Sequence, residues 1–187
     1  DGKLVNDVEP KDRDIAMVFQ NYALYPHMSV YDNMAFGLKL RKTPKDEIDK
    51  KVHDAAKILD LEHLLDRKPK ALSGGQRQAV TLLMAALKQP KLLLLDEHTA
   101  ALDPKTAAKV LELTEKIVAE NHLTTLMITH NMKDAIRMGN RLIMMHDGRV
   151  IYDVAGEEKK NLEVSQLLEK FEQAAGEEFA NDRMMLN

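Results

Sequence analysis

The stretch KLLLLDEHTAALD, from Lys91 to Asp103, places four leucines directly before two adjacent acidic residues. A short uninterrupted apolar run is typical of a parallel strand that is covered on both faces. Ligands of open parallel sheets bind at the carboxyl ends of the strands, where Asp96 and Glu97 would stand. Neighbouring residues of a strand point to opposite sides, so one carboxylate could hold Mg²⁺ while the other activates a water. A buried strand followed by an ordinary polar turn is the alternative interpretation.

The segments around this stretch alternate between strand and helix patterns. Residues 14–19 and 124–130 are short apolar runs that predict two further buried strands. Residues 43–61, 71–90 and 104–121 predict helices. Strands that alternate with helices favour an α/β layer with a parallel sheet, here interrupted by a helical block.

Local signals refine the ends of these elements. Thr43 is expected to cap the first helix, with Pro44 at its first helical position. Asp147 and Gly148 predict the turn of a hairpin over residues 141–154. A helical tail is expected over residues 161–187.

The string LSGGQRQ, residues 72–78, predicts a helix start that could bind an anion. Ser73 is a suitable cap and Gln76 stands in the capping-box position. Gly74 and Gly75 would let a phosphate approach free backbone N–H groups at the positive end of the helix dipole. An ordinary capped helix is the alternative.

Composition excludes several classes of protein. The 187 residues suffice for one domain, and the net charge of −3 gives no support for a nucleic-acid surface. The chain has no cysteine, which excludes disulfides and thiolate metal sites and fits a cytosolic protein. The polar beginning DGKLVNDVEPKDRD is no signal peptide, and it suggests a fragment or a processed chain.

Taken together, these motifs resemble the ATP-binding subunit of ABC transporters. Its five matching segments occur in the family order and are spread from residue 20 to residue 130. The resemblance covers nearly the whole chain. They are VFQ ending at Gln20 (the Q-loop), LSGGQRQ (the signature), LLLLDE (Walker B), TAALD ending at Asp103 (the D-loop) and ITH ending at His130 (the switch histidine).

The resemblance implies a P-loop NTPase fold, with a RecA-like ABC ATPase core and an inserted helical subdomain. Four segments are then expected. They are residues 1–20, a part of the core up to the Q-loop; residues 21–88, the helical signature subdomain; residues 89–155, the core with Walker B, D-loop and switch; and residues 156–187, a helical tail.

The resemblance also implies roles for single residues, with ATP and Mg²⁺ as cofactors. Asp96 would hold the Mg²⁺ shell, Glu97 would be the catalytic base, and His130 would contact the γ-phosphate. Gln20 would contact Mg²⁺ or the attacking water. The signature residues Ser73, Gly74, Gly75 and Gln76 would bind ATP held by the opposite subunit of a head-to-tail homodimer or heterodimer, and Asp103 would connect the two sites.

The partners implied by the family are membrane-spanning permease subunits, which would keep the chain at the cytoplasmic face of the cell membrane. They would dock near the Q-loop and the helical block, where an aromatic group offers apolar contacts, although ordinary core packing explains this group equally well. Its members are Tyr22, Tyr25, Tyr31 and Phe36. Two other functions stay open: a soluble ABC ATPase without a transport role, and a non-catalytic fragment or scaffold.

The sequence contains no G-x-x-x-x-G-K-[ST] pattern, the phosphate-binding loop of this family. We therefore expect a chain truncated at its N-terminus that is inactive by itself. A core that lacks the strand and helix of this loop should be weakly stable, or should associate through exposed apolar surface.

The two parts of the chain resemble different branches of the family. Residues 1–78 resemble sugar-importer ATPases, whereas the following residues resemble another importer subfamily. Ala79 and Met84 stand where sugar importers usually have arginines, and His98 replaces the usual proline after the acidic pair. A chimera joined near the signature and a divergent natural subfamily both explain this pattern.

Overall fold

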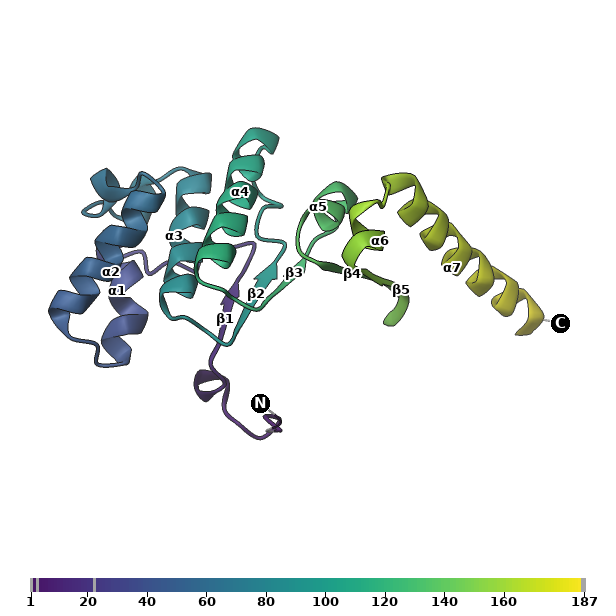
Figure 1. The fold of residues 1–187 in the computed structure, drawn as a ribbon, viewed down its shortest axis with the longest axis horizontal. Helices are drawn as coiled ribbons and strands as arrows, with labels where there is room; N and C mark the ends of the chain where they lie inside the picture. The colour runs from purple at the N-terminus through teal and green to yellow at the C-terminus, as the bar shows by residue number, and fades with distance from the viewer. Residues whose placement is uncertain (1, 3, 22, 186–187) are drawn as a thin grey trace. The chain divides into compact units, whose positions relative to one another are not determined.

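The computed structural model describes residue 2, residues 4–21 and residues 23–185 (Figure 1). Contacts between Cα atoms divide the chain into two compact units, Asp1–Ile128 and Thr129–Asn187. The first unit contains a parallel sheet and the second an antiparallel hairpin. The four segments expected from the sequence describe a finer division, and they stay a prediction.

The first unit is built on a three-stranded parallel sheet. Its strands are β1 (Ile15–Val18), β2 (Leu92–Asp96) and β3 (Thr125–Ile128), in the order β1-β2-β3. The leucine run of β2 fits its central position. A strand paired on both edges has its backbone groups hydrogen-bonded within the sheet, and buried parallel strands are typically continuous apolar runs. The predicted parallel α/β arrangement is confirmed.

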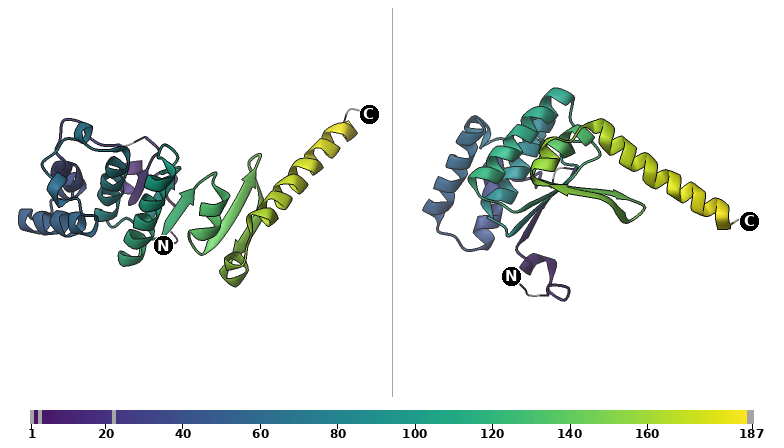
Figure 2. Two further views of the ribbon diagram at one scale, coloured as in Figure 1. Left: turned by 90° about the horizontal axis from the view of Figure 1, so that it is seen from above. Right: turned by 45° about the vertical axis from the view of Figure 1, so that its right-hand side comes forward.

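Helices cover one face of this sheet (Figure 2). Helix α3 packs against β1, and helices α1 and α4 pack against α3. The helices of this unit are α1 (Val30–Leu40), α2 (Lys45–Ile58), α3 (Gly74–Leu87) and α4 (Pro104–Glu120), with short 3₁₀ turns at Pro10–Asp12, Glu62–Leu64 and Pro69–Ala71.

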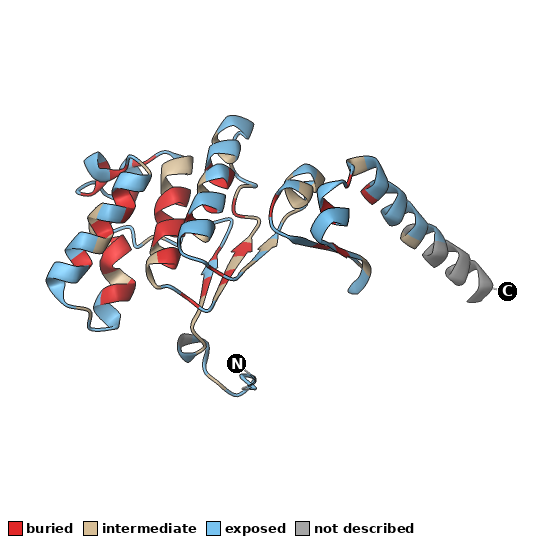
Figure 3. Cartoon of the chain, viewed as in Figure 1, coloured by how far each residue is buried: buried red, intermediate tan, exposed pale blue. Residues whose placement is uncertain are grey.

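Burial alternates along the strands, because successive side chains point to opposite faces. The face under the helices is closed, with Val18, Leu93 and Leu95 at most 1% exposed. The other face is open, since Leu126 is 51% exposed and Ile128 is 53% exposed (Figure 3). The prediction that β2 lies in a sheet covered on both faces is therefore wrong for the described residues: helices pack on one face only. The expected exposed apolar surface is present.

Up to residue 185, the last that the structure describes, the second unit contains an antiparallel hairpin and three helices. The hairpin turn lies at Asp147 and Gly148, as predicted, and both residues have positive φ (46° and 74°), as a type I′ turn requires. Its small core is formed by Leu142, Val154 and two leucines of the tail. The elements are α5 (Met132–Arg137), β4 (Arg141–His146), β5 (Arg149–Ala155), α6 (Gly156–Lys160) and α7 (Val164–Met185).

One local prediction needs correction, and one helix was missed. Pro44, and not Thr43, is the cap residue of α2, because its ψ of 145° is extended and the helix begins at Lys45. Helix α1 was not predicted at all. Its signal was present in the sequence, since Ser29 caps the helix by accepting a hydrogen bond from the backbone N–H of Asp32, three residues ahead of it.

Candidate functional site

The carboxyl ends of the three strands lie along one edge of the sheet. Two predicted site residues are found there: Asp96 at the end of β2, and Gln20 after β1. Asp96 is the last residue of β2 and pairs in register with Ile128 of β3. Gln20 lies two residues beyond the end of β1 and is exposed. The parallel register thus places Asp96 and the loop carrying Gln20 at the same edge.

Glu97 lies outside the strand, in a left-handed backbone conformation with a φ of 44°. This conformation is uncommon for a residue with a side chain and often marks a functional site. Its backbone N–H donates to the carbonyl of Ile128 at 3.0 Å. The expected strand alternation of Asp96 and Glu97 is therefore wrong, because the chain leaves the strand at Asp96 and the turn sets the direction of the Glu97 side chain.

A tight turn connects Glu97 to helix α4. The carbonyl of Glu97 accepts a hydrogen bond from the N–H of Ala100 at 3.0 Å, and the carbonyl of Thr99 accepts one from Leu102 at 3.1 Å. Asp103 then caps α4, accepting from the N–H of Thr106 at 3.1 Å. Hydrogen bonds to Thr106 lower the pKa of Asp103, so this carboxylate is ionised at neutral pH.

His98, the second residue of this turn, is buried against α4. It is 3% exposed, and its Nε2 lies 3.1 Å from Oγ1 of Thr114, which is 1% exposed. Burial lowers the pKa of His98 from 6.5 to about 4, so the imidazole is neutral near pH 7. In the sequence His98 stood out only as a departure from the family, since its partner lies sixteen residues ahead on another element.

The predicted signature forms a capped helix start. Ser73 Oγ accepts from the N–H of Gln76 at 3.2 Å, and Gln76 Oε1 accepts from the N–H of Ser73 at 2.9 Å. This reciprocal pair is a complete capping box, as predicted. The capping box uses the N–H groups of Ser73 and Gln76. Ser73 is exposed, and Gly74 and Gly75, which carry further N–H groups of this first turn, are partly exposed.

The signature and the first turn of α4, which directly follows the D-loop, approach closely within the first unit. A methyl group added to Gly75 would stand 2.3 Å from Cγ2 of Thr106, in the first turn of α4. Glycine is therefore required at this position because α3 and α4 approach closely. This contact links the helix start at Ser73 to the one at Asp103, and the sequence contained no signal that predicted it.

His130 follows β3 by two residues and is exposed. It belongs to the second unit, which begins at Thr129. Asn131, the next residue, caps helix α5 by accepting from the N–H groups of Lys133 and Asp134. The role predicted for His130 at a γ-phosphate stays a prediction.

Asp96 and Gln20 offer oxygen donors of the kind that Mg²⁺ prefers. No group of three or more His, Asp or Glu side chains within the described residues forms a metal site. Mg²⁺ keeps several waters and is often held by one or two carboxylates together with phosphates of the substrate. The donor set present therefore fits Mg²⁺ that arrives with a nucleotide, and does not fit a permanent protein cage.

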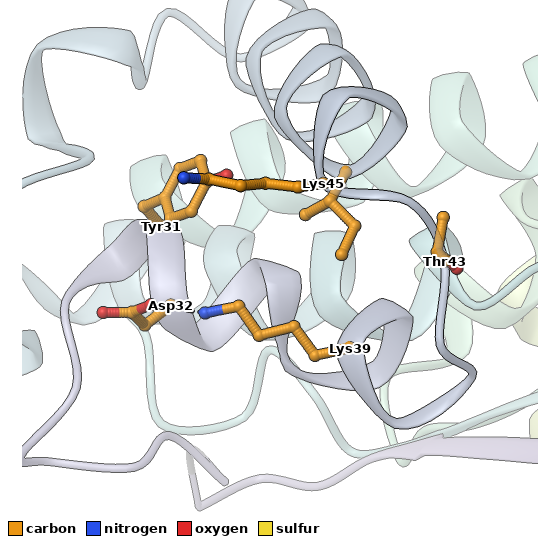
Figure 4. A pocket seen from close by; sticks show the side chains of 6 residues that line it. Tyr31, Asp32, Lys39, Thr43 and Lys45 are labelled. Atoms are coloured by element: carbon orange, nitrogen blue, oxygen red, sulfur yellow. Dashed lines mark hydrogen bonds and ion pairs between the residues drawn. The ribbon is translucent and has the colours of Figure 1, made fainter.

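A hollow of about 480 Å³ lies between α1 and α2, on elements other than the strand ends (Figure 4). Its polar lining is largely self-paired, since Lys39 Nζ lies 2.7 Å from Oδ1 of Asp32. Burial and a hydrogen bond to Asp49 raise the pKa of Tyr31 at its rim. We assign no ligand to it.

The predicted aromatic group is partly assembled. The rings of Tyr25 and Phe36 lie 4.6 Å apart, and Tyr25 is 37% exposed. Tyr31 packs against the core of the first unit. Tyr22 lies outside the described residues. Partial exposure is compatible with both interpretations of this group, core packing and partner contact.

Comparisons with known proteins identify relatives of this chain. The family model described as ABC transporter matches residues 1–100. The chain is 56% identical to the oligosaccharides import ATP-binding protein MsmX of Bacillus subtilis, over 80% of the chain and 41% of MsmX. It is 51% identical to the sn-glycerol-3-phosphate import ATP-binding protein UgpC of Bordetella avium, over 79% of the chain and 41% of UgpC.

A solved structure shows the same fold. CbiO1 of Clostridium perfringens, part of the ABC transporter complex CbiONQ, superposes with a TM-score of 0.73 at 32% identity. The match covers 86% of this chain and 64% of CbiO1. The chain thus spans about two fifths of the length of the curated relatives that it matches. Within the described part of the chain, no helix has the length and apolar character needed to cross a membrane.

Proposed function

This chain belongs to the ABC transporter family, as an ATP-binding subunit with the ABC ATPase fold, and we propose that within the whole protein it hydrolyses ATP to energise the import of a solute. The observation that carries the proposal is the sheet edge at which Asp96 ends β2 and Glu97 follows in a left-handed turn. A carboxylate at the carboxyl end of a central parallel strand is well placed for metal-bound phosphate.

In the proposed mechanism these residues divide the work. Asp96, with Gln20, would hold Mg²⁺, and this ion would neutralise phosphate charge when nucleotide is bound. Glu97 accepts a proton from the attacking water, and His130 contacts the γ-phosphate. The capped start of α3, with Ser73, Gly74, Gly75 and Gln76, contacts the phosphate of ATP held by an opposite subunit, and the backbone N–H groups outside the capping box are those of Gly74 and Gly75. Asp103 connects the two sites across that dimer.

The proposed substrate of the transporter is a carbohydrate or a related polyol phosphate. The similarity to MsmX and UgpC, which are named for oligosaccharide and sn-glycerol-3-phosphate import, supports this class. The proposed partners are membrane-spanning permease subunits, with the chain at the inner face of the cell membrane. No observation favours a nucleic-acid partner, and the net charge of −3 is unsuited to one.

The two-branch origin of the chain stays a proposal. The alignments with sugar-importer relatives extend over 147–150 residues, and therefore run beyond residue 78. This length supports the alternative of a divergent natural sequence, because the resemblance to that branch continues past the signature. Sequencing the source gene across residues 70–90 distinguishes the two.

Tight ATP binding by these 187 residues alone is not part of the proposal. They contain no G-x-x-x-x-G-K-[ST] pattern, whose backbone N–H groups and lysine normally hold the phosphates. We expect a titration of the 187-residue chain with a fluorescent ATP analogue and Mg²⁺ to give millimolar binding or none. Saturable micromolar binding would contradict this part of the proposal and point to another phosphate cradle.

Turnover by the whole protein tests the catalytic assignment. Glu97→Gln should lower kcat for ATP by about 100-fold or more, because the amide cannot accept the proton. Glu112→Gln is the matched control, since Glu112 is an exposed residue of α4. If the whole protein turns over no ATP under any condition, the alternative function of a non-catalytic scaffold replaces this one.

A further inference from the structure

The turn after β2 contains a buried histidine that the proposed mechanism does not use. His98 follows Glu97 directly, and its Nε2 lies 3.1 Å from Oγ1 of Thr114. Both side chains are almost fully buried, at 3% and 1% exposure. Burying two polar side chains costs desolvation free energy. The hydrogen bond between them has to offset this cost, so the two groups must lie in a well-defined geometry.

The direction of this hydrogen bond follows from the hydroxyl group. Thr114 Oγ1 lies 2.8 Å from the carbonyl oxygen of Val110, to which it donates its single proton. Toward His98 the hydroxyl oxygen can therefore only accept, so the imidazole carries its proton on Nε2. The chain of bonds runs from His98 through Thr114 to the backbone of α4, and it ties the turn to a rigid helix.

This anchor acts beside the strained residue of the site. Glu97 has a φ of 44°, and its own backbone bonds, to Ile128 and from Ala100, define the two sides of the turn. His98 stands at the second position of that turn, where proline would preset φ. A histidine has no such constraint, so its buried hydrogen bond to Thr114 adds to the backbone hydrogen bonds that hold the turn.

We propose that His98 is a positioning residue, which through Thr114 holds the backbone of Glu97 in its left-handed conformation and so sets where the Glu97 carboxylate stands. The backbone part of this inference is independent of the reaction. The catalytic part rests on the proposed function, in which Glu97 is the base.

The test uses substitutions that separate positioning from stability. Thr114→Val keeps the shape of the side chain but leaves the buried Nε2–H without an acceptor, whereas Thr114→Ser keeps the hydroxyl. The double variant His98→Leu/Thr114→Val removes both polar partners. Replacing both members of a buried pair by apolar groups is close to neutral for stability, although removing one is costly.

The first measurement is NMR spectroscopy of the 187-residue chain. A positive φ brings the amide and α protons of one residue close together, which gives Glu97 a strong intraresidue cross-peak. We expect this cross-peak in the original chain and in Thr114→Ser, and its loss in Thr114→Val and in the double variant. An unchanged cross-peak in a folded double variant would overturn the proposal.

The second measurement is ATP turnover by the whole protein, with urea unfolding as the measure of stability. In Thr114→Val and in the double variant, kcat should fall about 10- to 100-fold with KM within about twofold, since a misplaced base affects the chemical step. Thr114→Ser should retain most of the turnover. If the double variant recovers both its unfolding midpoint and its kcat, the pair has only a structural role and the inference is wrong.

The two proposals fail in distinguishable ways. If Glu97→Gln leaves turnover intact, the assignment of the base is wrong, and the NMR result still decides the backbone part. If Glu97→Gln abolishes turnover while the double variant keeps it, the proposed function stands and His98 has no positioning role.

Discussion

The two faces of the three-stranded sheet have similar sequences and different surroundings. Leu93 and Leu95 point under the helices and are at most 1% exposed, whereas Leu126 and Ile128 point to the open face and are more than half exposed. All four are branched aliphatic residues of parallel strands. The difference teaches that an apolar strand residue contributes to stability only as far as other elements cover it, which the strand pattern itself does not reveal.

The largest expected effect compares one leucine from each face. Leu95→Ala should lower the free energy of unfolding by about 3–4 kcal/mol, because it leaves a cavity in a closed core. Leu126→Ala should cost less than about 1 kcal/mol, because its side chain is already 51% exposed. Urea unfolding of both variants measures the difference. Equal losses would mean that the open face is covered in solution.

Burial of His98 against α4 should also make the free energy of unfolding depend on pH. Its pKa is about 4 in the folded chain and 6.5 in the unfolded chain, so between these values only the unfolded chain binds the proton. The free energy of unfolding should therefore fall by about 3 kcal/mol as the pH decreases from 7 to 4. The pH dependence of urea unfolding measures this, with His98→Gln as the control. An equal slope in the control would assign the effect to other groups.

A smaller effect is expected where α3 and α4 meet. Gly75→Ala should cost about 1–2 kcal/mol, because the new methyl group collides with Cγ2 of Thr106. Thr106→Ser removes that carbon, so the double variant Gly75→Ala/Thr106→Ser should recover most of the loss. A double-mutant cycle from thermal unfolding gives the coupling. Additive losses would show that the clash is relieved elsewhere.

A substitution on the open face of the sheet should have the smallest effect on stability. It should have the clearest effect on association. Leu126→Lys should change the free energy of unfolding by less than about 0.5 kcal/mol, since the ammonium group reaches water. It should reduce any self-association of the chain, because apolar patches promote contacts between molecules. Sedimentation velocity over a range of concentrations tests this. Lys109→Leu, on the exposed side of α4, is a control for changed surface charge.

Parts of the fold and of the candidate site could be predicted because their signals are local. The capping box of Ser73 and Gln76 involves residues three apart, and the Asp147-Gly148 turn needs only two positive φ values. The leucine run before Asp96 marks a central parallel strand by composition alone. For the same reason α1 could have been predicted from Ser29 and Asp32.

Other features were decided by contacts between distant segments. The chain leaves β2 at Asp96, and Glu97, whose φ is left-handed, donates its backbone N–H to Ile128, thirty-one residues ahead. His98 becomes a buried, neutral imidazole only because Thr114 lies opposite it on α4. No periodicity in the sequence reports such pairs.

The sequence by itself thus determined the three strands of the parallel sheet, the capped start of α3 and the acidic pair at the end of β2, because short-range backbone preferences and apolar patterns specify these features. The tertiary structure alone decided which face of the sheet is covered, why Gly75 has to be glycine, and how the turn that carries Glu97 is held. Each of these depends on which surfaces meet across the fold, and that information lies in packing and burial rather than in neighbouring residues.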